Sequence, residues 1–205
     1  MAITDPALPT PERWVQAALD VVAAGVDLLQ LRARTLDRAT LDPIARRLLH
    51  ATHTSPTRLL INTDLDLAVT VRAHGVHLPS NAPLPPDARA RLEDALGHPA
   101  LLSRACHTLD DLARANDEGA DLCTWSPVFA PRSKRADFPL QGLDGLAAAA
   151  RTSRSPLLAL GGLDVQRAPA CIGAGAAGVA VIGAIFGAAR PADAARALMR
   201  VVHRP

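Results

Sequence analysis

Three polar residues alternate with apolar or small ones in the segment LLQLRAR, where a predicted strand ends. Gln30, Arg32 and Arg34 share one face of the chain if the strand runs through them. Two guanidiniums and an amide on one face suit a phosphate or a carboxylate, because a planar guanidinium matches paired oxygens. The alternative is a solvated strand end in a chain whose cations are nearly all arginine.

Two glycine-containing segments near the C-terminus are candidates for binding an anion through backbone N–H groups. LLALGGLD carries Gly161 and Gly162, and GVAVIGAIFG carries Ile182 and Gly183. Glycine lets the backbone approach an anion closely at a helix N-terminus. Because these segments end the last two predicted strands, we expect the four residues to form a phosphate site. The alternative is that the glycine pair is simply a turn.

The segment TWSPVFAPRSKRADFPLQG has the length and the Pro-rich, polar composition of a functional loop. It carries Lys134, the only lysine of the chain. A compact ammonium in a chain that otherwise uses the planar guanidinium indicates a catalytic or binding role, with Ser133 beside it as a substrate-binding residue. The alternative is an accident of codon usage, and whether the loop closes as a lid is left open.

His107 follows another predicted strand, where an imidazole can move a proton near neutral pH. His107 or Thr108 could equally cap the helix that follows. Cys106 precedes the histidine, but adjacent strand residues point to opposite faces, so a Cys–His nucleophilic pair is not expected. His77 is predicted to be structural. The remaining histidines are predicted to lie on the surface: His50, His53, His74, His98 and His203.

A recurring pattern of helical stretch, glycine and short apolar run must position these residues. Gly25, Gly75, Gly119 and Gly175 each stand where a glycine that ends a helix turns the chain into a strand. Units of about 25 residues that alternate β and α predict an all-parallel sheet, and 205 residues hold eight of them. We therefore expect a single-domain (β/α)8 TIM barrel of the phosphate-binding type over residues 1–205. The strands are predicted at 2–4, 27–33, 58–62, 75–79, 100–105, 121–126, 157–161 and 178–183, and the alternative is an open doubly wound sheet.

The composition argues against several classes of protein. A formal charge of +2 and five aromatic residues, none of them tyrosine, argue against nucleic-acid binding. No apolar run reaches the roughly 18 residues of a membrane span, and the first residues do not resemble a signal peptide. Cys106, Cys123 and Cys171 are odd in number and far apart, so neither a disulfide framework nor a zinc site is expected. We expect a cytoplasmic protein.

Taken in order, these motifs resemble the thiamin phosphate synthase and TenI superfamily of small phosphate-binding barrels. The resemblance runs from TDP at 4–6 through LLQLRAR, LLINTDLDLAV, GVHLPS, the His107 segment, GADLCTWSPVF with Lys134, LLALGGL and GAAGVAVIGAIF. Synthases of this superfamily join a pyrimidine diphosphate to a thiazole phosphate, and use a Q-x-R-x-K face and aspartates that hold Mg²⁺. This chain keeps Gln30, Arg32 and Asn62 of that set.

The chain departs from the synthase pattern at the metal. Thr63 and Ala82 stand where the resemblance implies aspartates, Arg34 replaces a lysine, and Ala105 replaces a serine. Loss of both carboxylates is expected to cripple diphosphate departure. We therefore expect no metal site and no cofactor, with Mg²⁺ required only if the protein is a synthase after all.

The TenI-type branch resembles the chain better, because its members lack the metal aspartates and keep a histidine that matches His107. The resemblance implies a metal-independent thiazole tautomerase, an isomerase in which His107 is the acid and base. Lys134 and Arg32 would meet the carboxylate or ring, and the phosphate site would hold a small phosphorylated thiazole. The alternatives are an active thiamin phosphate synthase, a transferase, and a non-catalytic binding or accessory protein. The resemblance also suggests a homo-oligomer.

Overall fold

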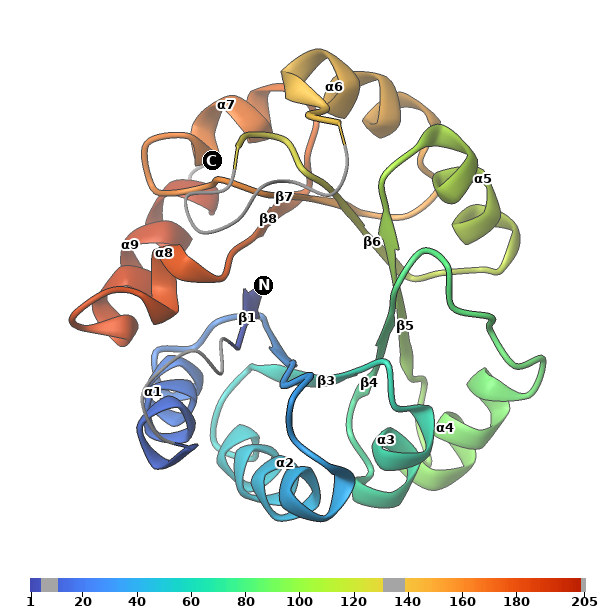
Figure 1. Ribbon diagram of the computed structural model, residues 1–205, viewed down its shortest axis with the longest axis vertical. Helices are drawn as coiled ribbons and strands as arrows, with labels where there is room; N and C mark the ends of the chain where they lie inside the picture. Colours follow the sequence, from blue (N-terminus) through green and yellow to red (C-terminus); the bar gives the residue numbers. More distant parts are fainter. Residues whose placement is uncertain (5–10, 131–138, 204–205) are drawn as a thin grey trace.

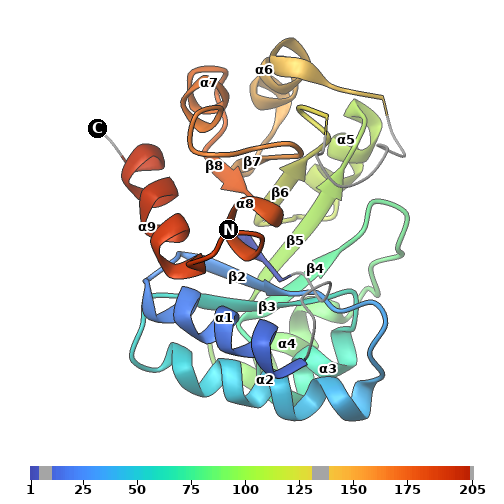
Figure 2. The same ribbon diagram turned by 60° about the vertical axis from the view of Figure 1, so that its left-hand side comes forward.

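The computed structural model describes residues 1–4, 11–130 and 139–203, and within them eight parallel strands pair in chain order. The strands are β1 (Ala2–Ile3), β2 (Leu28–Leu31), β3 (Arg58–Asn62), β4 (Gly75–Leu78), β5 (Leu101–Cys106), β6 (Leu122–Trp125), β7 (Leu157–Leu160) and β8 (Gly178–Ala180). The helices are α1 (Pro11–Ala23), α2 (Arg38–Thr52), α3 (Leu65–Val71), α4 (Ala88–Leu96), α5 (Leu109–Asp117), α6 (Gly142–Thr152), α7 (Ala168–Gly173), α8 (Gly183–Phe186) and α9 (Pro191–Val202). Figure 1 shows the helices arranged around the outside of the strands, and Figure 2 shows the same layers from the side.

The sheet closes on itself between its first and last strands. Ala2 bridges Val181 in parallel, and the Ile3 N–H donates to the Val181 carbonyl at 2.9 Å. The Val181 N–H in turn donates to the Met1 carbonyl at 3.1 Å. The predicted (β/α)8 barrel is therefore confirmed, and the open-sheet alternative is wrong.

Most strands are shorter than the predicted ranges because their C-terminal residues turn into loops. β3 has the predicted bounds, whereas β2 was predicted to run to residue 33 and ends at Leu31. β8 was predicted to run to residue 183 and ends at Ala180, and β5 is shifted by one residue toward the C-terminus. The loops that form the mouth of the barrel therefore begin earlier than the apolar runs suggest.

Three of the four glycines predicted to end helices have the left-handed backbone that such an end requires. Gly25, Gly119 and Gly175 have φ values of 82°, 70° and 98°. The prediction for Gly75 is wrong, because this residue begins β4 and has no positive φ. A Cβ on Gly75 would lie 2.0 Å from the carbonyl oxygen of Leu101, so the glycine allows β4 and β5 to approach.

Apolar side chains fill two separate regions. The larger core lies between the sheet and the helices and includes the fully buried Trp14 and Trp125. A small cluster of Ile3, Leu122, Leu158 and Ala180 lies inside the barrel. Burial on both faces is why the strands are continuous apolar runs. No helix in the described parts of the chain has the length and apolar character of a membrane span.

Candidate active site

Gln30 and Arg32 lie at the C-terminal end of β2, where barrel enzymes carry their active sites. Gln30 points into the barrel and is 1% exposed, and Arg32 is half-buried just beyond the strand end. The backbone of Arg32 is fixed by Thr4, whose Oγ1 accepts from the Arg32 N–H at 2.8 Å and donates to its carbonyl at 2.9 Å. The predicted alternation fails at Arg34, because β2 ends at Leu31 and Arg34 is exposed in the following turn.

Arg34 instead lines a cleft beside the mouth, between the ends of β2 and β3 and helix α2. The cleft has a volume of about 560 Å³, and its polar lining consists of Arg34, Arg38, Asn62, Thr63, Asp64 and Asn81. The guanidinium of Arg38 is 3.4 Å from Asp64 Oδ1. Two guanidiniums against one carboxylate make the cleft suited to an anion.

The same residues do not fit a divalent metal. Asp64 Oδ1 accepts the Leu67 N–H at 2.8 Å to cap α3, and the carboxylate also faces Arg38. The neighbouring Asp66 pairs with Arg91. Nowhere in residues 1–4, 11–130 and 139–203 do three histidine, cysteine or acidic side chains come together as metal ligands. Mg²⁺ binds through carboxylates that are open to it, so the predicted departure from the synthase pattern at Thr63 extends to its surroundings.

Thr108, and not His107, caps the helix that follows β5. Thr108 Oγ1 accepts the Asp111 N–H at 3.1 Å, and the Asp111 carboxylate accepts the Thr108 N–H in return. The half-buried His107 ring places Nδ1 2.8 Å from the Ser126 carbonyl oxygen. Since a carbonyl oxygen only accepts, Nδ1 carries a proton, and Nε2 is the ring nitrogen that can exchange one.

Cys106 lies on the opposite face of the chain from His107, as predicted. It is buried between β5 and the helices, where a hydrogen bond to the Cys123 thiol, together with burial, raises the pKa of the Cys106 thiol. All three cysteines are free, as predicted. The contact between Cys106 and Cys123 was not predicted, because it depends on the pairing of β5 with β6.

The four residues predicted as a phosphate site line one pocket. Gly161, Gly162, Ile182 and Gly183 surround a volume of about 240 Å³ at the ends of β7 and β8, with Asp164 at its edge. Asp164 Oδ1 accepts the Gln166 and Arg167 N–H groups, each at 3.1 Å. The first amides of a helix have no intrahelical acceptor, so those of α8 can bind an oxygen in this pocket.

The glycine pair is required by the loop that follows β6. Gly161 has φ 105°, and a Cβ on it would lie 2.8 Å from Pro127 Cα. Gly162 has φ 60°, and its Cβ would lie 2.5 Å from the Ala130 carbonyl oxygen. The Phe129 N–H also donates to the Gly161 carbonyl at 3.1 Å. The pocket of Gly161 and Gly162, called the glycine pocket below, is therefore in direct contact with the start of the long loop. Lys134 and Ser133 lie outside the described residues.

A polar layer inside the barrel was not predicted from the sequence. His77, predicted to be structural, is 6% exposed on the inner face of β4, and its Nδ1 lies 2.8 Å from Ser103 Oγ on β5. Burial and the charges of Arg104 and Arg32 lower the pKa of His77 to about 3, so its ring is neutral. The sequence signal for this layer was the alternation within LLSRAC and LCTW, which places one polar side chain of each strand on the inner face of the barrel. Among the histidines predicted to be on the surface, His74 is half-buried and accepts the Leu59 N–H at 3.1 Å.

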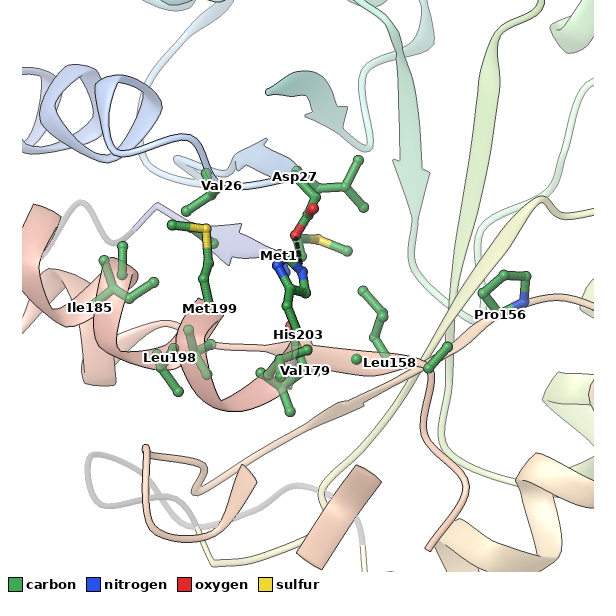
Figure 3. Close-up of a pocket in the computed structure, with 17 residues that line it drawn as sticks. Met1, Val26, Asp27, Pro156, Leu158, Val179, Ile185, Leu198, Met199 and His203 are labelled. Carbon is green, nitrogen blue, oxygen red and sulfur yellow. Dashed lines mark hydrogen bonds and ion pairs between the residues drawn. The ribbon is translucent and has the colours of Figure 1, made fainter. Parts of the chain in front are cut away.

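A further cavity lies at the other end of the barrel, where the strands begin (Figure 3). Its volume is about 240 Å³, and its lining is mostly apolar, with Leu158, Leu198 and Met199 among the side chains. Asp27 and His203 form an ion pair of 3.3 Å at its edge. Apart from Asp27 and His203, the residues that line this cavity are apolar or glycine.

Comparison with known proteins places these features in a family. Residues 1–185 match the family described as thiamine monophosphate synthase (TMP-TENI). The chain is 39% identical over 181 residues to the putative thiamine-phosphate synthase of Geobacter sulfurreducens, covering 88% of this chain and 83% of that protein. It is 38% identical over 181 residues to the thiamine-phosphate synthase of Anaeromyxobacter dehalogenans, covering 88% and 79%.

The solved structures support the fold. The thiamine phosphate pyrophosphorylase from Pyrococcus furiosus superposes with a TM-score of 0.83 at 23% identity, covering 98% of this chain and 93% of that one. The family match over residues 1–185 and the 39% identity to the Geobacter sulfurreducens protein confirm the superfamily resemblance. The relatives carry the synthase name, and so favour the alternative reading over the TenI-type branch preferred from the sequence.

Proposed function

Because the chain belongs to the thiamine monophosphate synthase (TMP-TENI) family, we propose that it catalyses the synthase reaction. The nitrogen of a thiazole phosphate attacks the methylene carbon of a pyrimidine diphosphate. The new C–N bond forms, the C–O bond breaks, and diphosphate leaves with the bonding electrons. The observation that carries this proposal is the 39% identity, over 88% of the chain, to a relative named as a synthase.

The mouth of the barrel offers a place for each part of the two substrates. The pocket of Gly161, Gly162, Ile182 and Gly183 suits the phosphate of the thiazole, because backbone amides at a helix start attract an anion. Gln30 on β2 and Arg32 just beyond it lie two strands from β8 around the closed barrel. The pyrimidine diphosphate would bind on that side.

The cleft of Arg34 and Arg38 suits the diphosphate leaving group. The residues present do not fit Mg²⁺, since the Asp64 carboxylate is held by a helix cap and an ion pair. Guanidiniums bind phosphate oxygens in a bidentate fashion and stabilise the charge that develops as diphosphate leaves. In this proposal Arg34 and Arg38 take the part that a metal ion plays in the synthase pattern.

The test is formation of thiamine phosphate from both substrates, assayed with EDTA and with added Mg²⁺. We expect one diphosphate to be released for each thiamine phosphate formed, both with EDTA and with added Mg²⁺. Arg34→Ala and Arg38→Ala are each expected to lower kcat/KM by about tenfold to a hundredfold. Arg58→Ala, an exposed arginine at the opposite end of β3, is the matched control and leaves the rate unchanged. Absence of product with Mg²⁺ and saturating substrates overturns the proposal.

A metal-independent thiazole tautomerase is a second candidate, favoured by the Thr63 site and by the geometry of His107. An imidazole with Nδ1 fixed by the Ser126 carbonyl can take up a ring proton at Nε2 and return it at another atom. The assay is isomerisation of a thiazole phosphate carboxylate in deuterated water. His107→Asn is expected to slow it by about a hundredfold or more, and an unchanged rate excludes this role. Binding of the thiazole without either reaction would identify a non-catalytic binder.

A further inference from the structure

The polar layer inside the barrel forms a floor directly beneath the mouth. The pairing registers of β2 to β6 place Gln30, His77 and Thr124 at one height, because neighbouring strands of such a barrel are shifted by about one residue. Ser103 lies just below them, in contact with His77. We call these four residues the barrel floor. TIM barrels fill such layers mainly with Val, Ile and Leu, so the presence of four polar residues in this layer calls for an explanation.

Two atoms of the barrel floor have no hydrogen-bond partner in the described part of the chain. They are Gln30 Nε2 and Thr124 Oγ1, in side chains that are 1% and 0% exposed. Nearly all buried polar atoms in folded proteins are paired, and an unpaired one costs stability. Such exceptions concentrate at functional sites, where a ligand completes the pairing.

Small residues lie next to the barrel floor on the side of the mouth. Ala105 pairs directly with Thr124 and is only half-buried. Ala180 is the residue of β8 at the height of the floor, and it also lines the pocket of Gly161 and Gly162. The unpaired atoms of Gln30 and Thr124 are covered in this structure, so a ligand held in the mouth contacts them only when the side chains above the floor move aside.

The barrel floor is polar but carries no charge, since the buried His77 is neutral. An uncharged surface with an amide donor and a hydroxyl suits a neutral heteroaromatic ring with nitrogen acceptors and an exocyclic amino group. The thiazole does not meet this description, because its single ring nitrogen must remain free to attack. The aminopyrimidine does.

We propose that Thr124 is a specificity-determining residue, whose hydroxyl, together with the amide of Gln30, hydrogen-bonds to the edge of the aminopyrimidine ring. This inference rests on the proposed synthase function. It assigns to β6 a substrate contact that motif comparison does not indicate, because Thr124 stands inside an apolar strand and outside the loops.

Thr124→Val tests the proposal, since valine keeps the shape of threonine and removes its hydroxyl. The matched control is Thr57→Val, at a buried threonine whose Oγ1 donates to the Val26 carbonyl at 2.6 Å. The unfolding temperature of each variant and its affinity for the pyrimidine diphosphate and the thiazole phosphate are measured by calorimetry. We expect Thr57→Val to lower the unfolding temperature and to leave affinity unchanged.

Thr124→Val is expected to keep or raise the unfolding temperature and to weaken pyrimidine diphosphate binding about tenfold, with thiazole phosphate binding unchanged. Thr124→Ser, which retains the hydroxyl, is expected to bind like the wild type. Unchanged pyrimidine affinity in Thr124→Val overturns the inference, as does a fall in unfolding temperature like that of Thr57→Val, which would mean that the hydroxyl is already paired. If the wild type itself does not bind the pyrimidine diphosphate, the proposed function fails first.

Discussion

His77 lies on β4 and His107 directly follows the neighbouring strand β5, yet their surroundings give the two rings different chemical properties. His77 is enclosed by the barrel and is neutral, because burial and nearby arginines lower its pKa to about 3. His107 is half-buried at the mouth, with Nδ1 oriented by the Ser126 carbonyl. His107 is therefore placed to exchange a proton, and His77 to offer a hydrogen bond without a charge.

The buried His77 is expected to make the protein less stable in acid. Between pH 6.5 and about 3 the unfolded chain binds a proton that the folded chain refuses, so the free energy of unfolding falls as pH falls. The loss approaches about 1.4 kcal/mol per pH unit. Urea unfolding at about pH 7 and about pH 5 measures it.

His77→Gln removes this titration and is expected to show a smaller fall between the two pH values. The exposed His50→Gln is the control and keeps the wild-type fall. His74, whose pKa is also lowered by burial, contributes equally to all three proteins. A fall in His77→Gln as large as that of the wild type contradicts the assignment.

Among the elements, the loops after β4, β6 and β7 are held in place by specific contacts. Arg104 on β5 donates to the carbonyls of Pro79 and Ala82 at 3.0 and 2.9 Å, and so fixes the loop after β4. The same guanidinium forms a bidentate pair with Glu118, with Nε 2.7 Å from Oε2. The first residues of the loop after β6, Pro127 to Ala130, lie against the glycine pair that follows β7. These contacts fix the described parts of the loops relative to one another.

Arg104→Met is expected to destabilise the protein by about 3–5 kcal/mol, because it leaves the Glu118 carboxylate partly buried and unpaired. The double variant Arg104→Met/Glu118→Met is expected to recover part of that loss. Arg154→Met, at an exposed ion pair, is the control and changes stability by less than about 1 kcal/mol. Chemical denaturation measures the free energy of unfolding of the three variants. A double variant that is less stable than Arg104→Met contradicts this account.

Gly162→Ala is expected to destabilise the loop after β7 by about 1–3 kcal/mol and to weaken thiazole phosphate binding. The reasons are its φ of 60° and the 2.5 Å approach of a Cβ to the Ala130 carbonyl. Gly173→Ala is the matched control, since nothing lies within 4 Å of its Cβ in α7. Thermal unfolding and calorimetry with thiazole phosphate check both; wild-type binding by Gly162→Ala would refute the role of this turn.

The barrel was predictable from the sequence because short local segments mark where each strand and each helix ends. An apolar run such as RLLIN gives β3 its bounds, and glycines such as Gly119 end the helices. The position of Gly161 and Gly162 directly after β7 was predicted, because it depends only on where an apolar run ends. The polar layer inside the barrel was missed, because which face of LCTW points inward follows only from the pairing of β5 with β6. Arg34 was misplaced because nothing local shows that β2 stops at Leu31.

At the scale of the whole molecule, the eight strand ends bring three different surfaces around one mouth. The glycine pocket follows β7 and β8, the arginine cleft follows β2 and β3, and the barrel floor lies beneath the mouth. In the proposed synthase reaction, the glycine pocket and the arginine cleft would each hold a phosphorylated group, and the two substrate rings would meet above the barrel floor. The apolar cavity at the other end of the barrel contains none of these surfaces (Figure 3).

The most direct measurement is the yield of thiamine phosphate when the protein is mixed with pyrimidine diphosphate and thiazole phosphate. The account predicts thiamine phosphate and diphosphate in equal amounts, in EDTA as well as in Mg²⁺, because Arg34 and Arg38 hold the leaving group. Product that appears only with Mg²⁺ contradicts the role of the two arginines. No product in either condition, with both substrates saturating, contradicts the central claim that this barrel is a synthase.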